Sequence, residues 1–404
     1  MQTAKTILSS LFKGGKGYYI WMGSLSIFVL AGLVAYLFQV RDGLIITGMR
    51  DQISWGLYIG NFTFLVGVAA AAVLLVIPAY IYHFKPIKEI ALFGELMAIT
   101  AIVLCILFIM VDVGKPEVFW HLLPGVGRMN FPQSILTWDV IVLNGYLILN
   151  LAAASYIVYN KYHKRDYKLS VMLPIVFISI PWAFSIHTVT AFLFNGLNAR
   201  PFWNTAVLAP RFIASALAAG PALMIIVFQV IRKHYKIGIT DEALGRIAEW
   251  VTYAIALHLY LFGAEVFKEF YSDTHHVASI EYLYYGLHHH NKLVPWMWMA
   301  FLFNIIAFVL FLVPKFRANY KMLNVGCVLL FIGVYIEKGV GLVIPGFVPG
   351  TLGEIYEYSE TLLEYLIVIG IWAFGAMFYT ALIHTVIPIY RGEIVSRKLK
   401  KIED

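Results

Sequence analysis

The sequence has little charge and almost no cysteine. Only 13% of its 404 residues are Asp, Glu, Lys or Arg, while 61% are hydrophobic. Soluble domains carry about 25% charged residues, so this composition excludes a water-soluble globular chain. Its two cysteines, Cys105 and Cys327, lie inside apolar runs and form no CxxC pair. We therefore interpret them as packing residues and expect no iron–sulfur cluster in this chain.

What the sequence has instead is long apolar runs, with a mean hydropathy of +0.78. Each run reaches or approaches the ~20 residues that a helix needs to cross a bilayer. The first run is followed by no small-residue cleavage site, so we expect it to be retained. The prediction is an all-α polytopic membrane protein, a single integral membrane domain over residues 1–404 with ten spans: 18–40, 54–83, 90–112, 134–159, 170–197, 203–231, 247–270, 294–314, 322–346 and 361–390.

The basic residues predict how the chain is oriented. Most Lys and Arg residues fall in the terminal segments and even-numbered loops, for example Lys161, Lys164 and Arg165. The positive-inside rule then places both termini in the cytoplasm, in a multi-pass protein of the cell membrane. Because the net charge of +7 is spread over loops, it does not indicate nucleic-acid binding. No loop is long enough for a soluble redox domain, so any such module must be another chain.

Polar side chains gather in the outer half of the predicted spans. His187 and Asn195 are eight residues apart and share one helical face. Such groups are costly in lipid and usually face a cavity or a partner. The alternative is that they bond to neighbouring helices or backbone carbonyls. The same half contains Trp55, Tyr58, Asn61, Asp112, Trp138 and Asp139.

This arrangement suits a site for a quinone, which is lipid-soluble. A quinone needs an apolar slot, aromatic walls and hydrogen-bonding groups at its two ring oxygens. Oxidation of a quinol releases two protons, so a base must lie within hydrogen-bonding reach. Histidine as a residue type titrates near neutral pH and suits that role. His187 is therefore the candidate base, and Asp139 is a candidate to orient it or to pass on its proton.

A second set of polar residues lies on the predicted seventh and ninth spans. His258, Glu265 and Glu269 occur at i, i+7 and i+11, which is one stripe of a helix. With Glu337, this stripe is a candidate path for protons between the middle of the membrane and the outer face. The alternative is a set of interhelical bonds that join Glu265 or Glu337 to Arg211 or Lys338.

Several short motifs resemble one protein family. They are D-V-G-K-P at Asp112–Pro116, T-W-D at Thr137–Asp139, I-H-T-V at Ile186–Val189, and the segment Pro210–Gly220. Together they are similar to the NrfD/polysulfide reductase C family of quinone-interacting membrane subunits. The segment Ile336–Pro349, followed by Glu357-Tyr358-Ser359, most resembles the DsrP branch, which is linked to dissimilatory sulfur and sulfate metabolism.

The resemblance implies two four-helix bundles with flanking terminal helices. It implies a non-covalent menaquinone near the outer face, with no haem or redox metal in this chain. It also implies partners: an extracytoplasmic ferredoxin-like iron–sulfur subunit, a multihaem cytochrome c, and other membrane and cytoplasmic subunits. By position, His187 and Asp139 would be quinone-site groups, with Trp55, Tyr58 and Asp112 nearby. Some relatives have a His where this chain has Ala70, so their pocket does not transfer unchanged.

Two other functions are open at this point. His187 and His258 lie on helices that run in the same direction at similar depth, so a b-type haem between them is conceivable. An anion transporter would use Arg200, Arg211 and Lys338. Transporters usually have helices broken near the membrane centre, whereas here Pro and Gly gather mostly at the ends of the predicted helices.

Overall fold

The protein is an all-α polytopic membrane protein. The computed structural model describes residues 14–122, 125–235, 237–272 and 277–395. Ten of its helical segments are long and apolar enough to span a membrane, which confirms the predicted number. In chain order they are α2 (Lys16–Asp42), α3–α4–η2 (Leu57–Ile81), α5 (Lys85–Asp112), α6 (Ile135–Tyr162), α7 (Leu169–Asn195), α8 (Leu208–Tyr235), α9 (Asp241–Ser272), α11 (Val294–Leu312), α13–α14–η5 (Tyr320–Phe347) and α15 (Leu362–Tyr390).

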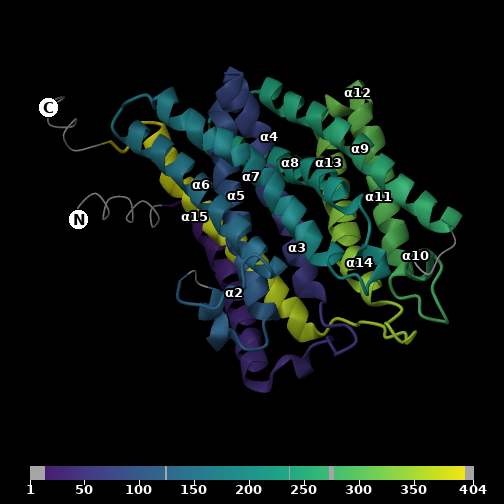
Figure 1. The fold of residues 1–404 in the computed structure, drawn as a ribbon. Helices are drawn as coiled ribbons and strands as arrows, with labels where there is room; N and C mark the ends of the chain where they lie inside the picture. Colours follow the sequence, from purple (N-terminus) through teal and green to yellow (C-terminus); the bar gives the residue numbers. More distant parts are fainter. Residues whose placement is uncertain (1–13, 123–124, 236, 273–276, 396–404) are drawn as a thin grey trace.

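The spans form two four-helix bundles and a flanking pair (Figure 1). The first bundle is a ring of α3, α5, α6 and α7, and the second is a ring of α8, α9, α11 and α13. Helix α3 joins the bundles because it also packs against α8 and α13. The terminal spans α2 and α15 pack on each other, and α15 packs on α5. This arrangement agrees with the bundle organisation that the family resemblance implied.

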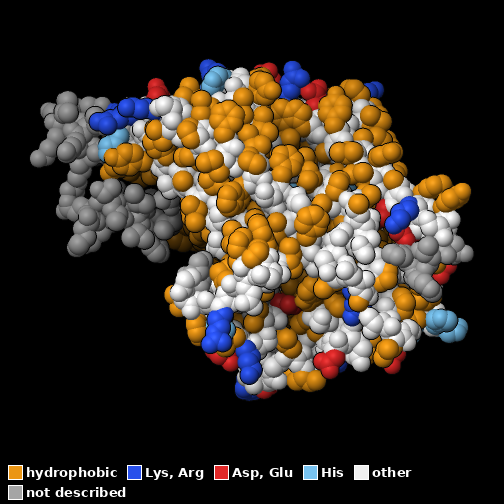
Figure 2. All heavy atoms as spheres, in the orientation of Figure 1, with side chains coloured by type: hydrophobic (Ala, Val, Ile, Leu, Met, Phe, Trp, Pro, Cys, Tyr) orange, Lys and Arg blue, Asp and Glu red, His pale blue; other side chains and the backbone are white. Residues whose placement is uncertain are grey.

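The two ends of the bundles differ. The connections after α2, α5, α7, α9 and η5 gather at the lower end in Figure 1, which we call the long-loop side; the other end is the short-loop side. Hydrophobic side chains cover the middle of the face shown in Figure 2, and charged side chains gather at its upper and lower edges. That banding is typical of a bilayer-spanning protein. Shorter elements are η1 (Leu44–Ile46), η3 (Pro116–Leu122), η4 (Pro201–Trp203) and α10 (Val277–Tyr284) on the long-loop side, and α12 (Pro314–Arg317) on the other.

Two predicted spans are not continuous α-helices. The second is interrupted by a turn at Ala71–Ala72 and ends in a π-helix at Ile77–Ile81, where Pro78 supplies no N–H. The ninth is interrupted at Gly339, whose backbone leaves the helical region (φ −81°, ψ −108°). A Cβ on Gly60 would lie 3.2 Å from the Gly339 carbonyl carbon, so α3 and α13 approach closely at this break. The expectation that Pro and Gly lie at helix ends was therefore wrong for Gly339 in the ninth span, whereas the second span is interrupted at two alanines and has Pro78 near its end.

Some predicted boundaries were also wrong. Helix α5 begins at Lys85 rather than residue 90, and α9 begins at Asp241 rather than 247. Both helices start with polar turns outside the apolar run, and hydropathy detects only the part of a helix that lies in lipid. The terminal residues 1–13 and 396–404 lie outside the described residues, so the cytoplasmic position of both termini stays a prediction.

Candidate functional site

The candidate site in the first bundle joins α6 to α7. The Thr190 hydroxyl donates to Asp139 Oδ1 at 2.8 Å. His187 precedes Thr190 by three residues and therefore lies on the same face of α7. Asp139 and His187 are buried, at 0% and 3% exposure. Both predicted catalytic residues are thus buried, and Thr190 links the α7 face that carries His187 to Asp139 on α6.

Both residues keep polar atoms without a protein partner. Both ring nitrogens of His187 lack a hydrogen-bond partner among the described residues. The same is true of Asp139 Oδ2. Buried polar atoms in proteins are almost always hydrogen-bonded, because desolvation without a partner costs about 1–3 kcal/mol. An imidazole and a carboxylate with this unused capacity fit a small polar ligand, such as the ring oxygen of a quinol.

Two of the residues predicted on the second span have defined roles. The Tyr58 hydroxyl donates to Gln39 Oε1 at 2.6 Å, and Gln39 donates to the Val111 carbonyl at 2.6 Å, which ties α3 to α2 and α5. Asn61 Oδ1 accepts from Tyr335 at 3.0 Å and from Trp372 at 2.7 Å, which ties α3 to α13 and α15. Their hydrogen bonds are satisfied by protein, so both act as helix-joining groups in this structure.

Trp55 lies in an aromatic cluster at the long-loop side. Its ring centroid is 5.5 Å from Phe194, 5.7 Å from Trp203 and 6.0 Å from Phe347. Arg200 stacks over Phe347 at 4.8 Å, and its Nη1 has no hydrogen-bond partner among the described residues. These rings contact the end of α7 and the loop that follows it, and their role as the aromatic wall of a ligand site stays a prediction.

The other predicted contact residues lie at the edge of this region. Asn195 donates to the Thr205 carbonyl at 2.7 Å and so fastens the turn between α7 and α8. Trp138 is 38% exposed and donates to the Pro132 carbonyl at 2.9 Å, away from the buried pair. Asp112 ends α5, and its Oδ1 has no partner among the described residues. Of these three, Asp112 alone has unused hydrogen-bonding capacity of the kind seen at His187.

Sequence reasoning missed a buried carboxylate beside this region. Glu364 is 0% exposed, and it accepts hydrogen bonds from the Gly48 N–H at 2.8 Å and from the Tyr358 hydroxyl at 2.5 Å. Burial, together with the Glu364 charge, raises the pKa of Tyr358, so this phenol stays protonated and donates. The signal was present as T-x-x-E at Thr361–Glu364, a capping box that begins α15.

The second bundle contains a network of charged side chains. The Arg211 guanidinium donates to Glu265 and, at 2.6 Å, to Glu337 Oε1. His258 Nε2 lies 3.1 Å from Glu337 Oε2, which also accepts from Asn304 at 3.0 Å. The three predicted proton-path residues, His258, Glu265 and Glu337, therefore meet around one arginine.

This network includes the interhelical bonds that were the alternative to a proton path. Arg211 pairs with both glutamates, whereas Lys338 donates instead to the Phe212 carbonyl at 3.2 Å. His258 Nδ1 and Asn304 Oδ1 lack partners among the described residues, so the network is not fully satisfied. Asn304 was missed, although it is a lone amide within the apolar run of α11.

Comparison with known proteins identifies the family. The sequence model described as "Polysulphide reductase, NrfD" matches residues 46–348. The chain is 27% identical to a putative dimethyl sulfoxide reductase membrane protein of Halobacterium salinarum, over 93% of this chain and 92% of that protein. It is 22% identical to the Hdr-like menaquinol oxidoreductase integral membrane subunit of Archaeoglobus fulgidus (85% and 86% covered), and 23% identical to the menaquinone reductase integral membrane subunit of Nitratidesulfovibrio vulgaris (93% of each). The chain belongs to the NrfD polysulphide reductase family.

Proposed function

We propose that this chain is the quinone-reactive membrane subunit of an oxidoreductase complex. The observation that carries the proposal is the buried His187 with two unpartnered ring nitrogens, on the helix face that contacts Asp139 through Thr190. Family membership supports it, since two relatives are named as menaquinol or menaquinone oxidoreductase subunits. The cofactor is menaquinone, bound without a covalent link.

His187 and Asp139 have different roles in the proposed proton transfer. Menaquinol gives up two protons and two electrons when it becomes menaquinone. His187 would accept a proton from one ring hydroxyl and pass it to Asp139, which Thr190 orients, and the His187 imidazole would then accept the proton of the second hydroxyl. The two electrons would pass to an iron–sulfur cluster held by a partner subunit. In the reverse direction the same groups return protons to the ring.

The partner would dock on the long-loop side. Large apolar side chains are exposed there outside the spans, including Val126 (68%), Phe131 (51%) and Leu352 (88%). Exposed apolar groups of this kind are typical of protein interfaces. Under the positive-inside orientation this is the extracytoplasmic face. We extend the proposal to the DsrP branch, with an iron–sulfur subunit and a multihaem cytochrome c as partners and a role in sulfur metabolism that includes proton translocation.

Replacement of His187 tests the proposal. We expect His187→Ala in the assembled complex to lower menaquinol turnover by roughly 10²–10⁴-fold, the range that a positioned acid or base contributes. His163→Ala is the matched control, because that imidazole is half-buried at the end of α6 and bonds the Tyr159 carbonyl of its own helix. Undiminished turnover in His187→Ala would remove this residue from the site.

The haem alternative makes a different prediction. A haem ligand turns one ring nitrogen to the metal and bonds an acceptor through the other, and His258 has Nε2 facing Glu337 and Nδ1 without a partner among the described residues. A b-type absorption band that disappears in both His187→Ala and His258→Ala would favour that alternative. The transporter alternative gains some support from the broken spans, and anion uptake by vesicles that contain only this chain would support it.

A further inference from the structure

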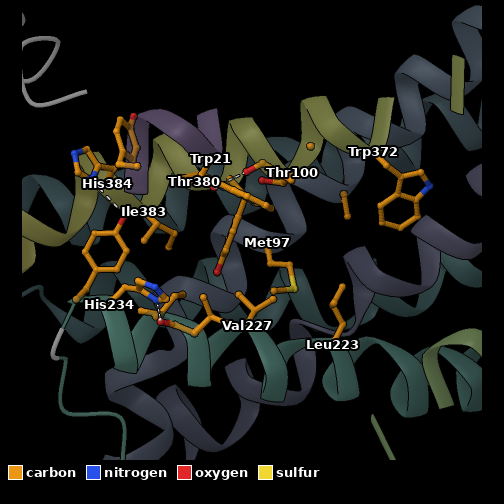
Figure 3. A pocket seen from close by; sticks show the side chains of 18 of the residues that line it. Trp21, Met97, Thr100, Leu223, Val227, His234, Trp372, Thr380, Ile383 and His384 are labelled. Carbon is orange, nitrogen blue, oxygen red and sulfur yellow. Dashed lines mark hydrogen bonds between the residues drawn. The ribbon is translucent and has the colours of Figure 1, made fainter. Parts of the chain in front are cut away.

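A cavity of about 1270 Å³ lies in the short-loop half of the protein, away from His187 and Asp139. Its walls come from α2, α3, α5, α8 and α15, which are far apart in the sequence (Figure 3). Ligand pockets for drug-sized molecules are usually about 300–1,000 Å³. This space is large enough for a molecule with a long chain, and the function proposed above does not use it.

The part of the cavity nearer the membrane centre is apolar and elongated. Trp372, Ala376, Thr380 and His384 repeat every four residues along one face of α15. The distance from Trp372 to His384 along the helix is ~18 Å, more than half of the bilayer hydrocarbon thickness. The facing walls carry side chains such as Met97 and Leu104 of α5 and Leu223 and Val227 of α8. A hydrocarbon chain fits such a slot.

The end of the cavity near the short-loop side carries imidazole and phenol side chains. His384 stacks on Tyr18 with centroids 4.5 Å apart, and its Nδ1 lies 3.2 Å from the Tyr235 hydroxyl. His234 lines the same end, with Nδ1 held 3.0 Å from the Val230 carbonyl. In Figure 3 the rings of His234 and His384 lie at the same end of the cavity, opposite Trp372.

The cavity has polar groups but no permanent charge. The described residues that line it include no Lys, Arg, Asp or Glu. A phospholipid phosphate is normally bound by cationic side chains, so these walls favour a neutral head group. Imidazoles and phenols both donate to and accept from carbonyl and hydroxyl oxygens, which are the groups on a quinone or quinol ring.

We propose that this cavity is a second binding site, for one neutral prenyl-quinone-type lipid. The head group of the lipid lies beside His384, Tyr235 and Tyr18 near the short-loop side. Its hydrocarbon chain runs along α15 toward the membrane centre and ends near Trp372. Trp372 donates at 2.7 Å to Asn61, so the inner end of the cavity contacts the residue that fastens α3. The site is separate from the His187 region. An experiment that excludes a quinone in one of the two places therefore does not exclude a quinone in the other.

Photo-crosslinking to a menaquinone analogue with a diazirine on its chain tests the site. In the wild-type complex in nanodiscs we expect labelled peptides from α15 around Trp372–His384 and from the start of α2. Ala376→Phe fills the apolar part of the cavity. His384→Phe keeps an aromatic ring stacked on Tyr18 but removes the ring nitrogens. Each variant should lower the labelling of the α15 peptides at least fivefold. Ile369→Phe, on the exposed side of the same helix, is the matched control and should leave it unchanged.

The same samples distinguish the occupants. Quinone and phospholipid extracted from the purified complex are measured by mass spectrometry, and we expect Ala376→Phe to lose bound quinone. Loss of phospholipid with unchanged quinone overturns the proposal in favour of a structural phospholipid, and no labelling near α15 overturns it outright. His187→Ala should keep the α15 labelling even where turnover is lost, so failure at one site is separable from failure at the other.

Discussion

At the scale of single residues, the buried ionisable groups divide by whether protein satisfies them. Glu364 and Glu337 accept several hydrogen bonds each, from groups on different elements. His187 has none among the described residues. A satisfied carboxylate holds helices together, whereas an unsatisfied imidazole keeps its hydrogen-bonding capacity for a ligand. This contrast is the reason for placing chemistry at His187.

Arg211 is expected to be the main stabilising charge of the second bundle. Arg211→Leu leaves Glu265 and Glu337 buried without their cation, and we expect a loss of about 3–5 kcal/mol in the free energy of unfolding. Arg246→Leu is the matched control, because Arg246 and Glu249 form an exposed pair worth about 0–1 kcal/mol. Thermal unfolding of the purified variants measures both, and equal midpoints would contradict the assignment.

Glu265 tests whether this network also moves protons. Glu265→Gln keeps the size and one hydrogen-bond acceptor for Arg211 but removes the titrating group. We expect proton uptake or release coupled to turnover to slow by tenfold or more, while the Kd for menaquinone changes less than twofold. If turnover and binding fall together, the carboxylate is structural.

The sequence could predict which residues matter but not their partners. Helical spacing placed His258 and Glu265 on one stripe, and both lie in the same network. Asn304 and Glu337 enter that network from other helices, and no spacing rule connects α9 with α11 and α13. The same limit applies to Asn61, predicted as a ligand contact, which is bonded to Tyr335 and Trp372 from two distant helices.

At the scale of elements, glycines set how closely the flanking helices pack. A Cβ on Gly32 would lie 2.7 Å from the Gly370 Cα, and the converse holds for Gly370. Without a hydrophobic driving force in lipid, such close packing is a main source of helix association. Hydropathy identified α2 and α15 as spans, but only their three-dimensional contact shows that they form a pair.

Gly370→Leu is expected to separate α2 from α15. Overpacking of this kind costs about 1–3 kcal/mol, so the thermal midpoint of the purified chain should fall. Gly23→Leu on α2 is the matched control, because a Cβ there meets nothing within 4 Å. Cysteine crosslinking between the two helices should weaken in Gly370→Leu alone. An unchanged midpoint and unchanged crosslinking would show that the contact tolerates a side chain.

At the scale of the whole molecule, the two sides differ in loops and exposed surface. The long-loop side carries exposed apolar groups, the His187 region lies in that half, and the second proposed quinone site lies in the other half. Ten spans and their bundling followed from apolar runs and family motifs. Orientation rests on the distribution of basic residues alone, and it decides on which side of the membrane the His187 region lies.

Labelling of introduced cysteines tests that orientation. Cys105 and Cys327 are free thiols but 0% exposed, so we expect no maleimide labelling of either in the folded chain. Leu352→Cys and Val126→Cys place exposed thiols on the long-loop side, and Glu242→Cys places one on the short-loop side. We expect a membrane-impermeant maleimide to label the first two in intact cells and Glu242→Cys only after permeabilisation. Because Leu352 or Val126 could be covered by a partner, the maximum signal of each variant is its labelling after denaturation minus that of the denatured parent chain, in which Cys105 and Cys327 react. The reverse pattern would place the His187 region in the cytoplasmic half and move the partner iron–sulfur subunit to the cytoplasm.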